Sequence, residues 1–309
     1  MTTGAAPAIH AVDLAKRYGS IVALDGLTMS VPRGEVFGFL GPNGAGKTTA
    51  VKLLLGLTVA TAGGAWLLGE PVGTAESRRR VGYLPELFRY PAWLSPVEVL
   101  TFHCRLVRMP RAERAPDIDR ILEMVGLAAR ARDRVGTFSK GMQQRLGLGV
   151  AMLGSPDVVF LDEPTSALDP VGRHDVRAII RELRSAGTAV FLNSHLLGEV
   201  EQVCDRVAVV DRGRVVAQGP LADIIGGGGG GVRLRVTGLP GVTAVLRRYG
   251  DVSEEGAWVG VAGADDATVA DIVADLVARG GRVHAVEPRR HSLEERFLEV
   301  LRPRDGQVS

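Results

Sequence analysis

The chain has 309 residues, and at about 100 to 200 residues per domain this length predicts two domains. Its residues are 46% hydrophobic and 23% charged, a composition that supports a buried core and excludes disordered and fibrous proteins. The 37 basic residues nearly cancel the 35 acidic ones, so we do not expect the strongly basic surface of a dedicated nucleic-acid-binding protein. Lysine is rare and occurs only at Lys16, Lys47, Lys52 and Lys140.

Two features of the sequence bear on the compartment. Cys104 and Cys204 lie far apart and have no metal-ligand spacing, so we expect two free thiols in a reducing compartment. The sequence has no uninterrupted apolar run of about 18 residues, and its start lacks the basic-then-apolar order of a signal peptide. We therefore expect a soluble cytoplasmic chain that reaches a membrane only through a partner.

The first two-thirds of the sequence alternate between strand-like and helical segments. Short apolar runs predict strands that are buried on both faces of an α/β sheet, at Ile9–Leu14, Glu35–Leu40, Val158–Leu161, Ala189–Leu192 and Arg206–Val210. Between about 95 and 154 the pattern becomes helical. Ser95, Pro96 and Glu98 form a helix start with an N-cap, a proline and an acid, and a second helix is predicted at Pro116–Val125.

Six consecutive glycines at Gly226–Gly231 predict a flexible linker, because residues without side chains have nothing to pack. The linker would separate a domain at 1–225 from a domain at 232–309; a long loop inside one domain is the alternative. The tail predicts a small α/β module without a recognisable catalytic constellation. Its expected elements are Val232–Thr237, Val242–Tyr249, Trp258–Val261, Asp266–Ala278, Arg282–Val286 and Ser292–Leu301.

A phosphate-binding loop is the first motif that carries chemistry. Gly41–Thr48 reads GPNGAGKT, which fits G-x-x-x-x-G-K-[ST], and it lies between a predicted strand and a predicted helix. Its glycines let backbone N–H groups curve around a phosphate, and the helix N-terminus adds a favourable dipole. Lys47 would reach the outer phosphates, and the Thr48 hydroxyl would bind Mg²⁺.

A pair of acids ends the predicted strand Val158–Leu161. An apolar strand that delivers a carboxylate to its C-terminal end is suited to a Mg²⁺ ligand, Asp162, and Glu163 could polarise the attacking water. Strands often end in acids at the solvent, so the pair gains its meaning from the phosphate loop. Together the two motifs predict a P-loop nucleotide hydrolase.

Three further motifs surround the acid pair. Phe138–Arg145 reads FSKGMQQR and precedes it, Ser166–Asp169 reads SALD and follows it, and His195 closes a later strand. In this order the motifs resemble those of the nucleotide-binding subunits of ATP-binding cassette (ABC) transporters, over about residues 8 to 225. The resemblance implies an α/β P-loop cassette with a RecA-like core, a β-subdomain and a helical subdomain at about 88–155, followed by a small C-terminal α/β domain.

The resemblance also implies a role for each matching residue. Glu163, His195 and Lys47 would be catalytic, with His195 at the γ-phosphate, and Thr48, Asp162 and Glu86 would hold Mg²⁺. Ser139, Gly141 and Gln143 would contact ATP held by the opposite subunit of a dimer. The other expected contacts to ATP are Tyr18, which would stack on adenine, and Gly41, Pro42, Asn43, Gly44, Ala45, Gly46, Thr48, Thr49 and Glu86.

Ordinary structural roles are the alternatives at several positions. Tyr18 could be a packing aromatic, His195 a core histidine and Ser139 a simple helix cap. Two departures from the family pattern stand out: Lys140 replaces the usual second glycine of the signature motif, and Glu86 stands where the family usually has glutamine. Glu86 adds a charge near ATP that would slow or retune hydrolysis, unless it is simply a solvated loop acid.

Finer features resemble the ATPase subunits of ABC-2 type exporters, which handle drugs, lipids, polysaccharides and antibiotics. They are FSKGM in the signature, YLPE at Tyr83–Glu86 and HSLEERFL at His291–Leu298. The resemblance implies a separate integral-membrane ABC-2 permease that docks near Leu87–Leu100, including Trp93. It also implies a second copy of the chain, no nucleic acid, and a place at the cytoplasmic face of the membrane. A soluble cassette protein that acts on ribosomes or DNA, and an importer ATPase, remain the alternatives.

Overall fold

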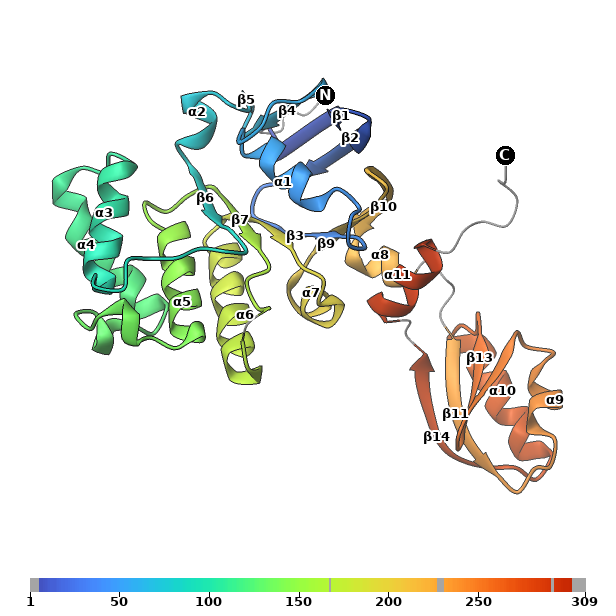
Figure 1. The fold of residues 1–309 in the computed structure, drawn as a ribbon. Coiled ribbons are helices and arrows are strands. Elements are labelled where there is room, and N and C mark those ends of the chain that lie inside the picture. Colours follow the sequence, from blue (N-terminus) through green and yellow to red (C-terminus); the bar gives the residue numbers. More distant parts are fainter. Residues whose placement is uncertain (1–5, 167, 227–230, 290–291, 302–309) are drawn as a thin grey trace. The chain divides into compact units, whose positions relative to one another are not determined.

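The computed structural model describes residues 6–166, 168–226, 231–289 and 292–301 (Figure 1). Its contacts divide the chain into two compact units, Met1–Pro220 and Leu221–Ser309. The division precedes helix α8 (Leu221–Gly226), whereas the sequence predicts it at the glycine run. The reason is that α8 packs against α11 (Leu293–Leu301), where the Arg296 Nε donates to the carbonyl of Ile224 at 3.0 Å. Of the predicted linker, 227–230 lie outside the described residues.

A six-stranded sheet forms the centre of the first unit, in the order β10-β9-β3-β8-β7-β6. Strand β10 pairs with β9 in antiparallel fashion and the other pairs are parallel. Every residue of β3, β7 and β8 is buried, as expected for apolar strands covered on both faces. The strands are β3 (Val36–Leu40), β6 (Val81–Leu84), β7 (Val158–Asp162), β8 (Ala189–Asn193), β9 (Arg206–Asp211) and β10 (Arg214–Pro220).

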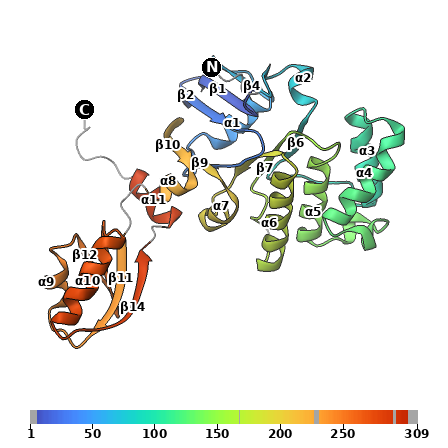
Figure 2. The same cartoon turned by 180° about the vertical axis from the view of Figure 1, so that it is seen from behind.

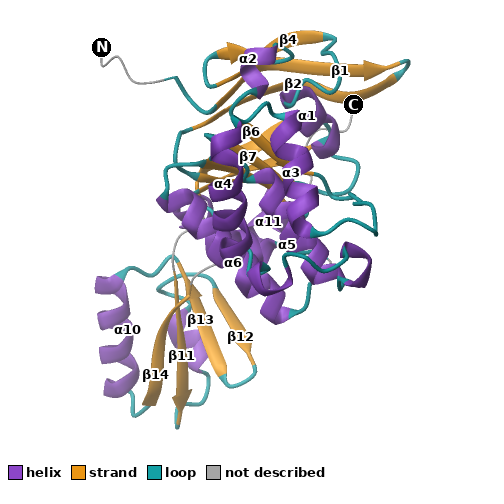
Figure 3. Ribbon diagram, turned by 90° about the vertical axis from the view of Figure 1, so that its left-hand side faces the viewer, coloured by secondary structure: helices purple, strands orange, loops and turns teal. Residues whose placement is uncertain are grey.

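Each face of this sheet is covered by a different layer. Helix α1 (Lys47–Leu54) and a second, antiparallel sheet pack on one face of the six-stranded sheet and form a hydrophobic core with it. Figure 3 shows the second sheet as a separate layer. Helix α6 (Pro170–Ser185) packs against β8, and α7 (Leu197–Val203) lies so close to β3 that a Cβ at Gly38 would come 2.8 Å from Val200. The second sheet has the order β2-β1-β4-β5, with β1 (Ile9–Tyr18), β2 (Ile21–Val31), β4 (Ala62–Leu67) and β5 (Glu70–Pro71); α2 (Ala75–Arg78) follows.

Three helices form the helical part of the first unit: α3 (Pro96–Leu106), α4 (Arg111–Met124) and α5 (Lys140–Ala151). Short 3-10 turns lie at Ala128–Arg130 and Val135–Thr137. Figures 1 and 2 show α3 and α4 at the opposite end of this unit from β10.

The predicted start of α3 is confirmed and that of α4 is wrong. A full capping box starts α3: the Glu98 carboxylate accepts from the Ser95 N–H at 2.8 Å, and Ser95 Oγ accepts from the Glu98 N–H. Helix α4 begins at Arg111 and contains Pro116, which was expected to start it. The preceding segment RAERA consists of strong helix formers, so one missing backbone hydrogen bond at the proline does not end the helix.

The second unit contains a βαββαβ chain order with the sheet order β12-β13-β11-β14, which is the ferredoxin-like arrangement. Residues Leu246 of α9 and Ile272 and Leu276 of α10 form a core with the sheet. The sequence predicts each of these elements except β12, whose residues VSEE are mostly polar. The elements are β11 (Gly231–Thr237), α9 (Val242–Leu246), β12 (Val252–Glu255), β13 (Trp258–Ala262), α10 (Asp266–Ala278) and β14 (Arg282–Arg289).

Candidate active site

The predicted phosphate loop connects β3 to α1 at the C-terminal edge of the six-stranded sheet. Gly46 is the N-cap of α1, with a left-handed φ of 99°, and a Cβ at this residue would lie 2.4 Å from the carbonyl of Ala23. Only glycine fits such a conformation and such an approach. Lys47 folds back over the loop, and its Nζ donates to the carbonyls of Gly41 at 2.6 Å and Pro42 at 3.1 Å.

The rest of the loop forms a tight turn before α1. Asn43 and Gly44 are exposed, and Gly44 also has a left-handed φ, of 82°. Ala45 is buried, and its N–H donates to the carbonyl of Pro42 at 3.1 Å, which closes the turn. Thr48 and Thr49 follow Lys47 in the first turn of α1, so their hydroxyls and N–H groups belong to the same helix start.

The two acids lie next to this loop because β7 and β8 run parallel to β3. Asp162 ends β7, and its Oδ1 accepts a 2.6 Å hydrogen bond from Nδ2 of Asn193, which ends β8. The N–H of Glu163 donates to the carbonyl of Asn193 at 2.9 Å. Asn193 therefore fixes both acids, a role that we did not predict. The available signal was a polar residue at the end of an otherwise apolar strand.

His195 holds the second carboxylate. Its backbone N–H donates to Oε1 of Glu163 at 3.0 Å, and its ring Nδ1 lies 2.8 Å from Oε2. The ring is more than half exposed, whereas the side chain of Glu163 is only 10% exposed. His195 is therefore not a buried core histidine. With Nδ1 at Glu163, a contact to a phosphate would use Nε2 and require the imidazolium form.

Glu163 has an unusual backbone conformation. Its φ is 51°, in the left-handed region that non-glycine residues avoid, and Ser166 Oγ donates to its carbonyl at 3.1 Å. Such outliers cost about 1–3 kcal/mol each and persist where the surroundings fix them. Glu163 donates to Asn193 and accepts from Ser166 and His195, and these hydrogen bonds supply that constraint.

Burial dominates the electrostatics of the site. Burial lowers the pKa of the Lys47 ammonium, and nearby Glu163 and Asp162 act in the opposite direction. Burial raises the pKa of Asp162, partly offset by the bond from Asn193, and it raises the pKa of Glu163, partly offset by His195. Burial, with the charges of Asp162 and Glu86, raises the pKa of Tyr83 to about 12. A desolvated pair of carboxylates beside one lysine is suited to a bound cation and to a polyanion.

The residues present fit a magnesium ion that is shared with a nucleotide. Oδ1 of Asn193 is buried and accepts no hydrogen bond, and Oε2 of Glu163 is buried with the His195 Nδ1 beside it at 2.8 Å. In the described part of the chain, no three acidic, histidine or cysteine side chains converge into a metal cage. Mg²⁺ is usually bound by one or two carboxylates together with substrate phosphates, so a partial donor set is the appropriate one.

The remaining predicted residues lie on other elements. Tyr18 ends β1 and is 47% exposed, with the Lys16 Nζ 4.9 Å from the centre of its ring. Glu86 is exposed in the loop after β6, although its charge acts on Asp162 and Tyr83. Ala167 of the SALD motif lies outside the described residues; Asp169 is the N-cap of α6 and accepts from the Gly172 N–H at 2.8 Å.

The signature residues form the start of α5. Ser139 is exposed and caps the helix, because its Oγ accepts from the Met142 N–H at 3.2 Å. The Gln143 side chain donates to the carbonyl of Phe138 at 3.3 Å. A Cβ at Gly141 would meet the Leu168 side chain at 3.4 Å and the Ser139 hydroxyl at 3.9 Å, both ordinary contact distances. Packing within the chain therefore does not require glycine at this position.

Comparisons with known proteins identify the family of this chain. Residues 24–166 match the family model described as ABC transporter. An uncharacterized ABC transporter ATP-binding protein of Synechocystis sp. is 40% identical over 288 residues, which are 92% of this chain and 80% of the relative. The linearmycin resistance ATP-binding protein LnrL of Bacillus subtilis is 34% identical over 75% of this chain and 76% of the relative. The bacitracin transport ATP-binding protein BcrA of Bacillus licheniformis is 38% identical over 69% of this chain and 70% of the relative.

Solved structures show the same fold. An ATP-binding subunit of an ABC transporter matches with a TM-score of 0.65 and 30% identity, over 70% of this chain and 91% of that one. An ATP-binding cassette in its ADP conformation matches with a TM-score of 0.62 at 22% identity, which bears on the fold alone. No described helix of this chain is both long and apolar enough to cross a bilayer. The chain belongs to the ATP-binding proteins of the ABC transporter family, which are ATPases.

Proposed function

We propose that this chain is the ATPase subunit of an ABC-2 type exporter and that two copies of it power a separate membrane permease. The observation that carries the proposal is the meeting of Lys47, Asp162, Glu163 and His195 at one edge of the central sheet. Relatives named for linearmycin resistance, bacitracin transport and Nod factor export support the exporter class. The chain would lie at the cytoplasmic face of the membrane, attached through the permease.

The site residues divide the work of hydrolysis. Thr48, Asp162 and Glu86 would hold Mg²⁺, which neutralises charge on the phosphates when bound. The P-loop N–H groups and Lys47 position the phosphates of ATP, and the exposed ring of Tyr18 offers its face to adenine. Glu163 orients the attacking water and takes its proton, while His195 fixes the rotamer of Glu163 through Nδ1.

The second copy would complete the site. Ser139, Gly141 and Gln143 lie on the exposed start of α5, where the helix N-terminus favours an anion. Packing within the chain does not require glycine at position 141. Close approach of an external group would explain why a residue without a side chain stands there. We infer that this group is ATP bound to the other copy, so that the two copies close head to tail.

The permease would dock on the helical part of the unit. Large apolar side chains are exposed there, with Leu87 87% and Trp93 73% exposed. A cavity of about 270 Å³ lies in the same region, lined by Arg89, Tyr90, Pro91, Leu94, Val99, Phe102 and His103. Exposed apolar groups around a partly apolar hollow suit a short apolar helix from a membrane partner.

The catalytic assignment is tested with Glu163→Gln. The variant should bind ATP as tightly as the wild type, hydrolyse it at least about 100-fold more slowly, and accumulate as an ATP-bound dimer. Nucleotide binding, phosphate release and light scattering measure the three effects. Unchanged hydrolysis would remove Glu163 from the mechanism, and loss of ATP binding in Lys47→Ala serves as the positive control.

The exporter assignment predicts an ABC-2 permease gene beside the gene of this chain, and the test co-expresses the two proteins. Trp93→Ser should reduce recovery of the chain in the membrane fraction when the two are co-expressed, without lowering its melting temperature. Val59→Ser, at a residue that is 81% exposed elsewhere on the unit, is the matched control and should have no effect. Equal membrane recovery for both variants would argue against docking on this surface.

A further inference from the structure

The turn between β9 and β10 supports the phosphate loop from outside. The N–H of Gly213 in this turn donates to the carbonyl of Ala45 in the loop at 2.9 Å. The carbonyl of the same glycine accepts from the N–H of Asp25 in β2 at 3.0 Å. One residue thus links the loop, the central sheet and the antiparallel sheet through its two backbone groups.

The junction around Gly213 has no spare room. Gly213 has a φ of 78°, and a Cβ there would lie 2.8 Å from the Cα of Leu24. The loop itself is equally close to its neighbours, because a Cβ at Gly41 would lie 2.2 Å from the carbonyl of Val210 in β9. The shape of the loop therefore depends on where β2 and the β9–β10 turn sit, as well as on β3 and α1.

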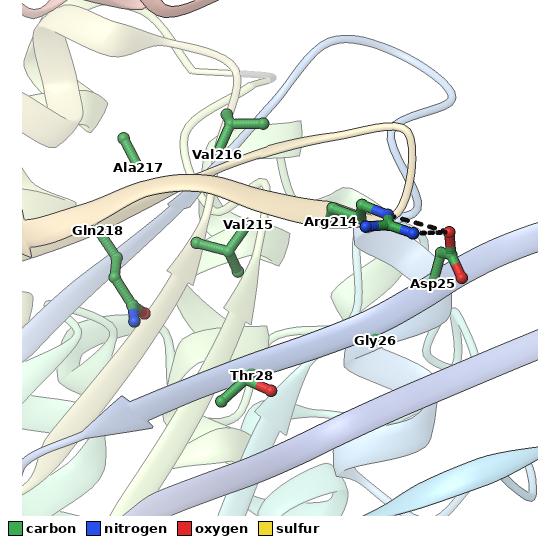
Figure 4. Close-up of a pocket in the computed structure, with 8 residues that line it drawn as sticks. All are labelled: Asp25, Gly26, Thr28, Arg214, Val215, Val216, Ala217 and Gln218. Atoms are coloured by element: carbon green, nitrogen blue, oxygen red, sulfur yellow. Dashed lines mark hydrogen bonds and ion pairs between the residues drawn. The ribbon is translucent and has the colours of Figure 1, made fainter.

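One ion pair fastens this junction, and Figure 4 shows it at the end of an open pocket. The Arg214 guanidinium, at the start of β10, donates from Nε at 3.0 Å and from Nη2 at 2.7 Å to Oδ2 of Asp25. Beyond the pair the two strands enclose a pocket of about 400 Å³, into which Val215, Gln218 and Thr28 project. Strands β2 and β10 belong to different sheets, so no β-ladder replaces the pair.

We propose that Asp25 and Arg214 are positioning residues for ATP binding. By fastening β10 to β2, the pair keeps Gly213 against Ala45 and holds the P-loop in its phosphate-binding shape. The proposal rests on the proposed function, in which Gly41–Thr49 binds ATP. Both side chains are largely exposed, at 45% for Asp25 and 68% for Arg214. Pairs of this kind change an equilibrium by up to about five-fold, which sets the expected size of the effect.

The test measures nucleotide affinity and turnover in the full chain. Asp25→Ala and Arg214→Ala should each weaken binding of Mg·ATP by about two- to five-fold and raise KM while kcat stays unchanged, because the same contact is lost in the ground and transition states. The charge swap, Asp25→Arg combined with Arg214→Asp, should recover most of the affinity. Rescue by the swap separates a role for the pair from a role for either side chain alone.

A matched pair in the second unit supplies the control. Arg233 also donates from Nε and Nη2 to one oxygen of Glu287, at 2.9 and 2.5 Å, with both side chains nearly half exposed. Glu287→Ala should leave ATP affinity unchanged. If the Asp25 and Arg214 variants match this control in affinity, or if the swap restores nothing, the pair has no positioning role. If Lys47→Ala retains ATP affinity, the P-loop assignment itself fails, which is a different result.

Discussion

At the scale of single residues, Glu163 shows that this site lowers the stability of the fold. Its backbone has a left-handed φ, and its carboxylate is largely buried beside a second acid, Asp162. Hydrogen bonds to Asn193 and His195 hold it there without removing the penalty, since burial still raises its pKa. A residue kept in a strained and desolvated state is typical of a site shaped for chemistry.

Glu163→Gln should therefore stabilise the free chain at neutral pH. A carboxyl whose pKa is raised in the folded state binds more protons there than in the unfolded chain. The free-energy cost of burying the charged carboxylate is absent at pH values below its ordinary pKa of 4.5 and complete above its raised pKa in the folded state. The stability gained by the glutamine variant should therefore grow as the pH rises from the first pKa to the second. A gain of about 1 kcal/mol corresponds to about 2–4 °C in melting temperature.

Thermal melts at pH 4 and pH 7.5 measure this difference. Glu123→Gln, at an exposed position of α4, is the control and should shift the melting temperature by the same small amount at both values. A glutamine variant of Glu163 that is less stable than the wild type at pH 7.5 would mean that the contact with His195 outweighs burial.

At the scale of elements, α5 contains glycines with two different roles. A Cβ at Gly147 would lie 2.7 Å from the ring of Phe88 and 2.8 Å from a methyl group of Leu84, so a side chain there would have to displace both. A Cβ at Gly141 would meet the Leu168 side chain at 3.4 Å and the Ser139 hydroxyl at 3.9 Å, without a clash. The core therefore restricts the side chain at Gly147, whereas no described part of the chain restricts it at Gly141, where we propose an external contact.

Gly141→Ala and Gly147→Ala should separate these roles. Gly141→Ala should leave the melting temperature unchanged or slightly raised, because alanine is the better helix former, while ATP hydrolysis falls by at least about ten-fold. Gly147→Ala should lower stability by about 1–3 kcal/mol through overpacking. Full activity in a stable Gly141→Ala variant would contradict an external contact at the signature.

The elements also show what the sequence could predict. Strands β3, β7, β8 and β9 were expected within one residue of their observed ends, because continuous apolar runs mark strands covered on both faces. Strands β2 and β4 were not expected: β1, their neighbour in the sheet, pairs with bulges against both, and buried residues alternate regularly only in the second half of each strand. Periodicity carries little signal when bulges shift which residues face the core.

The candidate site could likewise be predicted from the sequence only in part. Its motifs could be located along the chain because glycine spacing and strand-end acids have direct chemical meaning. The contact of Asn193 with Asp162 and the junction of Gly213, Ala45 and Asp25 could not be predicted, because they depend on which strands are neighbours. Strand order is set by packing across the whole unit, which local patterns do not encode.

At the scale of the whole molecule, the proposed function divides each ATP site between two copies of the chain. Lys47, Asp162, Glu163 and His195 are joined by contacts and charge within the chain. Ser139 instead uses its Oγ to cap its own helix and lies on an exposed surface. We therefore propose that the signature motif acts on ATP bound to a second copy, and dimerisation would then be a condition of catalysis.

Mixed dimers distinguish action in the second copy from action within one chain. One variant carries Ser139→Ala with an intact P-loop, and the other carries Lys47→Ala with an intact signature. If signatures act across the dimer, half-sites from the two inactive variants combine into one complete site, and an equimolar mixture hydrolyses ATP faster than either variant alone. If they act within a chain, each chain keeps one defect and the mixture stays inactive.

A mixture of wild type with a variant that carries both substitutions should give the opposite result. A chain that carries both substitutions, paired with wild type, contributes a defect to each composite site. Such pairs should be inactive, so adding the double variant at fixed wild-type concentration should depress hydrolysis below that of wild type alone. Sites contained within one chain would leave the wild-type activity intact. The two mixtures contain the same substitutions in different combinations, so altered folding or altered ATP affinity cannot produce both outcomes. The outcomes differ only in whether an intact signature faces an intact P-loop.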